Sequence, residues 1–201
     1  MKILIVDDHA VLRAGLCQVL AAGLRAELRE AASAEAALIE AQQFRPQLAV
    51  LDIGLPGRSG LTILPALTAL GVRVVVLSAF SEPVYAQRAL DAGAHGYVTK
   101  NASPAVLLEA LRAAADGKRF IEPEVAQDLA LRNVAAGGKL DQLTERELEI
   151  LRLLAAGRSL TEIAAIFNVS YKTIANTASL MRTKLGAPRM ADLVRLAVGT
   201  G

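Results

Sequence analysis

Short apolar runs alternate with segments of helical periodicity over the first 118 residues of this chain, and this alternation limits the fold more than any other feature. Parallel strands need a long crossover connection, and an α-helix normally supplies it. Runs rich in Val, Ile and Leu are typical of strands buried between two layers of helices. The sequence therefore predicts an α/β fold with a doubly wound, five-stranded parallel sheet, its strands at residues 3–6, 26–30, 48–51, 74–77 and 96–99.

The alternation ends near Gly117, and only helical segments follow. Residues 119–142 combine a short helical segment at 123–131 with the sequence AAGG, which is typical of a flexible connection. Glycines near expected helix ends, such as Gly15 and Gly60, are interpreted as backbone punctuation. We therefore predict a first domain, a linker and a small all-α domain at residues 1–118, 119–142 and 143–201.

Composition favours a soluble, cytoplasmic protein. The formal net charge is only +2, so the chain as a whole requires neither a nucleic acid nor a membrane as partner. Cys17 is the single cysteine, which excludes an intrachain disulfide and suits a packed thiol in a reducing compartment. The longest uncharged apolar stretch, near Gly60 to Val72, contains Pro65 and is too short for a membrane span. We expect no leader, because the sequence starts directly with a strand.

Polar residues directly follow four of the predicted strands. Asp7 and Asp8 follow the first strand, Asp52 the third, Ser78 the fourth and Lys100 the fifth. In an open parallel sheet the carboxyl ends of the strands lie at one edge, and ligands bind there. A single Asp at a strand end is most often a turn former or a helix cap, but the joint pattern favours a functional site.

The chemistry of this predicted crevice matches phosphoryl transfer. Carboxylates that lie together repel one another unless a cation joins them, and Mg²⁺ prefers such hard oxygen ligands. Asp52 can act as a nucleophile toward phosphorus, since carboxylates form aspartyl-phosphates in known enzymes. The metal and the Lys100 ammonium would neutralise charge on the phosphoryl oxygens, and the Ser78 hydroxyl could donate a hydrogen bond to one of them.

With these strand ends and the segment DIGLPGRSGL at 52–61, residues 1–118 resemble the receiver domain of bacterial two-component response regulators. The resemblance implies a flavodoxin-like fold with Asp52 as the phosphoacceptor. It further implies that the metal ligands are Asp7, Asp8, Asp52 and the Gly54 backbone carbonyl. The residues implied for phosphoryl contact and switching are Ser78, Lys100 and Tyr97.

Two residues near this site keep two interpretations each. Tyr97 matches the family's aromatic residue that turns inward when the hydroxyl engages phosphate, and a half-buried strand residue is an equally good interpretation. His9 follows the acid pair, where it either flanks the site or only begins the next helix.

The helical part begins with a capping-box pattern at Thr144 and Glu147, which starts a helix that ends at Gly157. A later helix follows the turn NVS, with Ser170 as its N-cap and Gly186 as its stop. Two helices joined by such a tight turn indicate a helix-turn-helix motif. After the first helix, the expected helices span residues 160–167, 171–184 and 190–198, and the second of these is the one that follows the turn.

The helix at 171–184 has two distinct faces. One stripe should pack inward and consists of Ile174, Ala178, Met181 and Leu185. The opposite face is polar and free of acids, which suits a recognition helix in the DNA major groove, although on charge alone an ordinary solvated face explains it as well. The candidate DNA contacts are Lys172, Thr173, Asn176, Thr177, Ser179, Thr183 and Lys184.

The stretches LTERELEIL, GRSLTEIA, VSYKTI and RTKL resemble the LuxR-type DNA-binding domain, which together with a receiver defines the NarL/FixJ family of response regulators. Relatives usually have His where Thr177 stands, and often a basic residue or Glu at Ala175. Asn176 is therefore the best candidate for base contact, because its amide can pair with adenine. The fourth helix corresponds to the one that relatives use for pairing, with a seam expected at Leu193, Leu196 and Ala197.

These resemblances predict a DNA-binding response regulator. Mg²⁺-dependent phosphorylation of Asp52 by a sensor histidine kinase would control binding to double-stranded DNA and hence transcription, with a homodimer as the phosphorylated or DNA-bound form. The chain would not be a turnover enzyme. One alternative is a phosphate-ester hydrolase acting through Asp52, although Gly54 stands where such phosphatases have a second acid. Another alternative makes the helical part a protein-binding bundle.

Overall fold

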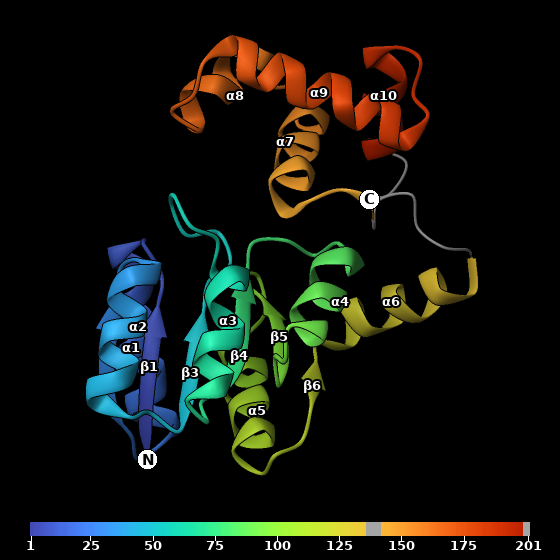
Figure 1. Ribbon diagram of the computed structural model, residues 1–201. Coiled ribbons are helices and arrows are strands. Elements are labelled where there is room, and N and C mark those ends of the chain that lie inside the picture. The colour runs from blue at the N-terminus through green and yellow to red at the C-terminus, as the bar shows by residue number, and fades with distance from the viewer. Residues whose placement is uncertain (136–141, 199–201) are drawn as a thin grey trace. The chain divides into compact units, whose positions relative to one another are not determined.

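Six parallel strands form one sheet in the first compact unit of the chain, Met1–Leu131 (Figure 1). The computed structural model describes residues 1–135 and 142–198. The strand order is β2-β1-β3-β4-β5-β6, so the chain reverses its direction of travel across the sheet after β2. The strands are β1 (Lys2–Val6), β2 (Glu27–Ala31), β3 (Leu48–Leu51), β4 (Arg73–Ser78), β5 (Gly96–Thr99) and β6 (Phe120–Ile121).

The more completely a strand is buried, the more clearly its apolar sequence indicates a strand. All residues of β3 and β5 are buried, as are all but the first residue of β1 and of β4. Such strands need apolar side chains on both faces. The outer strand β2 is buried only at Ala31, so its sequence is mostly polar and gave a weak signal.

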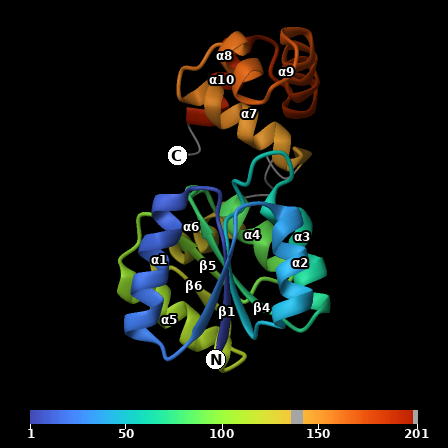
Figure 2. The ribbon, with the colours of Figure 1, turned by 90° about the vertical axis from the view of Figure 1, so that its left-hand side faces the viewer.

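Helices cover both faces of the sheet, which confirms the predicted doubly wound α/β fold. In Figure 2, α1 and α5 lie on one face and α2, α3 and α4 on the other. Leu16 and Leu20 of α1 and Leu111 of α5 pack with Ile3 and other strand residues into one buried cluster. The helices are α1 (Ala10–Gly23), α2 (Ala34–Phe44), α3 (Gly60–Ala69), α4 (Pro83–Asp91) and α5 (Pro104–Ala115).

The predicted number of five strands was wrong, because β6 adds a sixth. Phe120 N–H donates to the His95 carbonyl at 2.9 Å, which pairs β6 with β5 inside the segment interpreted as linker. A two-residue strand has no periodicity to detect. After β6 the helix α6 runs over Pro123–Ala135, four residues longer than the predicted segment at 123–131. The three predicted domain ranges stay predictions.

The second unit, Arg132–Gly201, contains the helices α7 (Glu145–Ala155), α8 (Leu160–Ile166), α9 (Tyr171–Leu185) and α10 (Met190–Val198). The predicted capping box is present, since Glu147 N–H donates to Thr144 Oγ1 and Thr144 N–H donates to Glu147 Oε2. The predicted inward stripe of α9 is confirmed, and it packs with other residues in a small core. This core includes Leu148, Leu151, Ile163, Ala164, Ile174, Ala178, Met181, Leu185 and Leu193.

Two of the glycines interpreted as punctuation differ in their surroundings. Gly60 begins α3 so close to β3 that a Cβ at this position would overlap the carbonyl oxygen of Asp52. Gly60 therefore allows α3 to rest on the backbone that carries Asp52. Gly15 lies inside α1, and a Cβ there would meet nothing within 4 Å.

These settings predict opposite effects of the same substitution. Gly60→Ala should destabilise the first unit by about 2 kcal/mol, because the added methyl group must displace backbone rather than a flexible side chain. Gly15→Ala is the matched control and should stabilise it by roughly 0.5–1 kcal/mol, since alanine favours a helix interior. Urea unfolding followed by circular dichroism measures both, and equal stabilities of the two variants would contradict the close approach.

Candidate functional site

The register of the sheet brings Asp7 and Asp52 to the ends of neighbouring strands. Val6 of β1 pairs with Leu51 of β3, so the two aspartates that follow these residues are neighbours. Asp52 N–H donates to the Val6 carbonyl at 2.8 Å, which extends the ladder by one residue. Asp7 is 1% and Asp52 3% exposed. Two carboxylates are thus held side by side in a buried position at the carboxyl edge.

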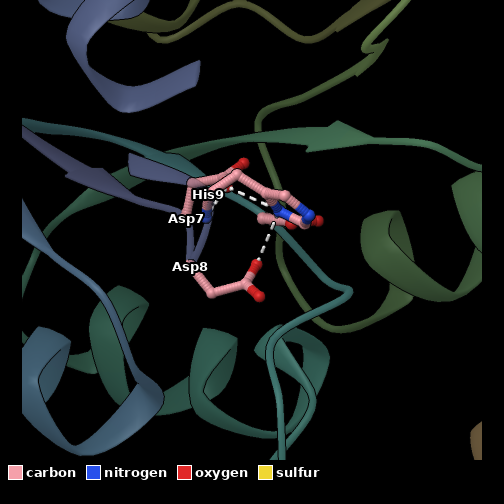
Figure 3. A group of neighbouring side chains, drawn as sticks. Asp7, Asp8 and His9 are labelled. Atoms are coloured by element: carbon pink, nitrogen blue, oxygen red, sulfur yellow. Dashed lines mark hydrogen bonds and ion pairs between the residues drawn. The ribbon is translucent and has the colours of Figure 1, made fainter. Parts of the chain in front are cut away.

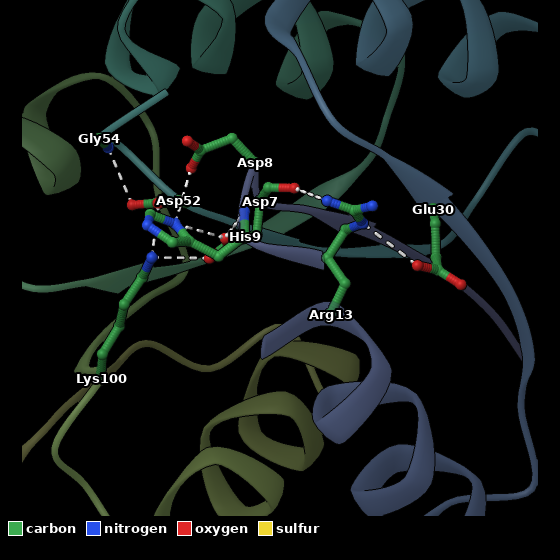
Figure 4. Close-up of polar contacts among 8 residues, drawn as sticks. All are labelled: Asp7, Asp8, His9, Arg13, Glu30, Asp52, Gly54 and Lys100. Carbon is green, nitrogen blue, oxygen red and sulfur yellow. Dashed lines mark hydrogen bonds and ion pairs between the residues drawn. The ribbon is translucent and has the colours of Figure 1, made fainter. Parts of the chain in front are cut away.

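Lys100 joins these carboxylates (Figure 4). Its Nζ lies 2.6 Å from Asp52 Oδ2 and 2.7 Å from Asp7 Oδ2. Burial lowers the pKa of the Lys100 ammonium, but its hydrogen bonds to Asp52 and Asp7 outweigh burial and raise the pKa above its ordinary value. Burial raises the pKa of the Asp52 carboxyl, although hydrogen bonds from Lys100 and from Gly54 act in the opposite direction.

Asp7, Asp8, His9 and Asp52 form a cluster whose candidate ligand atoms all lie within 4.8 Å of one another. Figure 3 shows the first three of these residues. Asp8 Oδ1 is buried and accepts no hydrogen bond, and His9 Nδ1 lies 2.9 Å from it. A buried carboxylate oxygen that makes no hydrogen bond of good geometry, beside two further carboxylates, is a suitable environment for a hard cation once the exposed His9 imidazole turns aside. The residues present therefore fit a metal ion of the Mg²⁺ type.

His9 and Gly54 each hold a carboxylate in place through the backbone. His9 N–H donates to Asp7 Oδ1 at 2.8 Å, and the residue is also the N-cap position of α1. Both interpretations of His9 therefore apply, because it flanks the site and begins the helix. Gly54 N–H donates to Asp52 Oδ1 at 2.8 Å. The role of the Gly54 carbonyl as a metal ligand stays a prediction.

Ser78 and Tyr97 are both completely buried and are connected through one backbone residue. Ser78 Oγ accepts a hydrogen bond from Phe80 N–H at 3.0 Å, and Tyr97 Oη donates to the Phe80 carbonyl at 2.7 Å. Burial raises the pKa of the Tyr97 phenol. Tyr97 is thus turned inward, while the Ser78 carbonyl accepts Lys100 N–H at 2.7 Å.

Sequence reasoning missed Arg13 as a support of the site. Its Nη1 donates to the Asp7 carbonyl at 2.7 Å, and its Nε lies 3.2 Å from Glu30 Oε2. Arg13 therefore ties the end of β1 to α1 and to β2. Its position one turn into α1 was the only signal in the sequence, and helices carry arginines there for many reasons.

Apart from Lys184, the candidate DNA contacts on α9 fall into two groups. Lys172, Asn176 and Ser179 are exposed, and within the described part of the chain their side chains have no intramolecular partner. Several hydroxyls instead bind the helix itself, as Thr177 Oγ1 does by donating to the Thr173 carbonyl at 2.9 Å. The contacts of this second group are made by Thr173, Thr177 and Thr183.

Lys184 and Arg182 make contacts inside the helical unit. Lys184 Nζ lies 2.7 Å from Glu147 Oε2, and Glu147 is buried. Burial tends to raise the pKa of the Glu147 carboxyl, but the bonds from Lys184 and Thr144 outweigh it and lower the pKa. Arg182 donates to the carbonyls of Ala187 and Pro188. A DNA contact by Lys184, which stays a prediction, would compete with its pair to Glu147.

The seam expected on α10 needs a correction at Leu193. Leu193 is completely buried inside the unit, so it is not available for pairing with another chain. Leu196 is half-buried, and the side chain of Ala197 lies outside the described residues.

Comparison with known proteins places both units in one class. Residues 3–112 match the response regulator receiver domain, and residues 141–197 match the bacterial regulatory proteins of the luxR family. The transcriptional activator protein ExaE of Pseudomonas putida is 40% identical over 213 aligned residues, which cover 100% of this chain and 97% of the relative.

Solved structures of RcsB agree with this match. A structure of the Salmonella typhimurium RcsB response regulator is 28% identical, has a TM-score of 0.64, and covers 97% of this chain and 96% of that chain. A structure of two RcsB dimers bound to two parallel DNAs is 27% identical, has a TM-score of 0.63, and covers 98% of this chain and 97% of that chain.

A receiver followed by a LuxR-type helix-turn-helix unit defines a DNA-binding two-component response regulator. The chain belongs to the NarL/FixJ family of these regulators, which confirms the resemblance seen in its sequence. Among the described residues, no helix is both long and apolar enough to cross a membrane.

The buried Asp52 carboxylate predicts a stability that depends on pH. Asp52→Asn should raise the free energy of unfolding at pH 7, because ionising a carboxyl whose folded pKa lies above its unfolded value costs stability. Lys100 keeps Asp7 as its partner in this variant. The difference in free energy of unfolding between Asp52→Asn and the wild type should shrink as pH falls through the folded pKa of Asp52. It should vanish below the ordinary pKa of 3.8.

Urea unfolding at a series of pH values measures this difference. Asp116→Asn, at an exposed aspartate of the same unit, is the matched control. An Asp52→Asn variant that is no more stable than the wild type at pH 7 would contradict the prediction.

Proposed function

We propose that Asp52 accepts a phosphoryl group from a sensor histidine kinase and that this modification controls DNA binding by the helical unit. The observation that carries the proposal is the Lys100 ammonium, which bridges Asp52 and Asp7 beside the acidic cluster. This arrangement supplies a carboxylate nucleophile, a fixed cation and free oxygen ligands at one sheet edge. These are the groups that phosphoryl transfer to an aspartate requires.

The reaction itself needs no proton from Asp52. An oxygen of its carboxylate forms a bond to phosphorus, while the bond from phosphorus to the donor nitrogen breaks and its electron pair stays with the donor imidazole. Lys100 can follow the developing charge because its Nζ already lies 2.6 Å from Asp52 Oδ2. Asp7, Asp8, Asp52 and the Gly54 carbonyl would hold Mg²⁺, which supplies positive charge opposite the phosphoryl oxygens.

Ser78 and Tyr97 would report the modification. Ser78 Oγ accepts a hydrogen bond from Phe80 N–H, and its own proton would turn from the Tyr97 phenol to a phosphoryl oxygen. Tyr97 binds the carbonyl of the same Phe80, so a movement of this segment changes the environment of the ring. A phosphate that stays on Asp52 then acts as a signal, and the chain acts as a cytoplasmic switch rather than a turnover enzyme.

In this proposal α9 binds double-stranded DNA, and this binding regulates transcription. Exposed Lys172, Asn176 and Ser179 on an acid-free face support this proposal. A homodimer that binds paired half-sites would add the contributions of two such helices. The RcsB relative has been solved as dimers bound to DNA, which supports the same assembly for this chain.

Phosphorylation of the full chain is the first test. With Mg²⁺ and acetyl phosphate, intact mass spectrometry should show the addition of one phosphoryl group, and the addition should depend on Mg²⁺. Asp52→Asn should abolish it, whereas the surface control Asp116→Asn should not. No addition in the wild type, or an unchanged addition in Asp52→Asn, would contradict the assignment. Steady hydrolysis of a phosphate ester would instead support the hydrolase alternative.

Selection of bound sequences from a random DNA library tests whether the helical unit binds DNA sequence-specifically. Asn176→Ala in the phosphorylated full chain should relax the preference at one base pair by about 1–3 kcal/mol, because the amide would read a base edge. Lys172→Ala should weaken binding to all sequences alike and reduce the salt dependence, since a phosphate contact carries no sequence information. Binding that remains independent of sequence in the wild type would favour the protein-binding bundle.

A further inference from the structure

Glu122 is a buried acid that the proposed phosphoryl chemistry does not use. It directly follows β6 and precedes Pro123, the first residue of α6, and it is 8% exposed. A buried carboxylate is costly unless donors satisfy it, so its contacts indicate what it does.

Backbone and side chain of Glu122 serve two different elements. Its N–H donates to the Tyr97 carbonyl at 3.0 Å, which continues the pairing of β6 with β5. Its own carbonyl accepts Ala126 N–H at 2.9 Å, the first turn of α6, and is therefore used by the helix. The carboxylate oxygen Oε2 accepts Thr99 N–H at 2.6 Å instead. The side chain thus supplies the acceptor that a longer β6 would have supplied to β5.

Thr99 is the residue before Lys100, so this bond acts at the edge of the phosphoacceptor site. On its other side Thr99 pairs in register with Ser78 of β4. Lys100 N–H also donates to the Ser78 carbonyl at 2.7 Å. The backbone that carries the Lys100 ammonium is therefore fixed by β4 on one side and by the Glu122 carboxylate on the other.

An ionised acceptor is well suited to this position. Hydrogen bonds to a carboxylate are shorter and stronger than those to a neutral group, and the 2.6 Å bond is of this kind. An apolar residue at 122 would leave the Thr99 amide buried without an acceptor. Glu124, in the first turn of the same helix, is exposed and provides a matched acid without this contact.

We propose that Glu122 is a positioning residue that sets Lys100 through Thr99 and transmits changes at the phosphoacceptor site to the start of α6. When Lys100 turns from Asp52 and Asp7 toward a phosphoryl group, the end of β5 loses the two ion pairs that tie it to β1 and β3, and the Thr99–Glu122 bond carries the resulting shift to the residue before the helix. Along the chain α6 leads directly into the helical unit. The inference rests on the proposed phosphorylation of Asp52.

Hydrogen exchange of the α6 amides in the full chain measures this transmission. In the wild type, acetyl phosphate with Mg²⁺ should change the exchange rates in the first two turns of α6 by about threefold or more. Glu122→Ala should take up the phosphoryl group more slowly and lose this response. Glu122→Gln, which keeps an oxygen acceptor, should restore both, and Glu124→Ala should behave as the wild type.

Each other outcome has a defined meaning. Wild-type uptake rate and α6 response in Glu122→Ala would overturn the proposal, as would a Glu122→Gln variant that behaves like Glu122→Ala. If Glu122→Ala does not fold, as judged by circular dichroism, Glu122→Asp replaces it. The aspartate keeps the charge but is too short to reach the Thr99 amide, so it should also lose the response, and a retained response would overturn the proposal.

A double-mutant cycle without phosphodonor separates this inference from the proposed function. Absence of phosphoryl uptake by the wild type would refute the function alone. Lys100→Met should still change α6 exchange in the wild-type background and leave it unchanged in the Glu122→Ala background. Equal effects of Lys100→Met in both backgrounds would refute the coupling through Glu122.

Discussion

The contact of the Lys100 ammonium with Asp7 and Asp52 is the interaction on which the arrangement of the receiver site depends. It joins the ends of β1, β3 and β5, and it compensates two carboxylates that are almost completely buried. Without this cation the carboxylates would repel one another at a position that water hardly reaches. The same contact does not use the oxygens of Asp8, so one cation both joins the strand ends and leaves ligand atoms for a metal.

The sequence predicted the central strands and the strand-end residues well, for a physical reason. Strands β1, β3, β4 and β5 are buried on both faces, which requires the apolar runs that make them visible. Parallel topology then places the residues that follow these strands at one edge, as with Asp7, Asp52 and Lys100. Helix caps such as Ser170 were equally readable, because capping is a local interaction between residues three positions apart.

What the sequence did not reveal depends on contacts between distant backbone segments. Strand β6 is defined by its pairing with β5. The Glu122 carboxylate accepts its hydrogen bond from the Thr99 amide, which lies 23 positions earlier in the chain. Gly60 was readable as a helix start, but its close approach to the Asp52 carbonyl has no signal in the local sequence. The pair between Lys184 and Glu147 likewise joins two helices far apart in sequence, so a lysine expected on the DNA face turned out to have a partner within the unit.

The internal use of Lys184 and Arg182 has a consequence for how the regulator can occupy DNA. The basic residues of α9 are Lys172, Arg182 and Lys184, and two of these three are already committed inside the unit. The α9 helix by itself therefore releases few counterions when it meets a duplex, and its contact gains little from charge. Tight occupancy must then come from joining several units on one stretch of DNA. Such a regulator would respond steeply to the number of active chains.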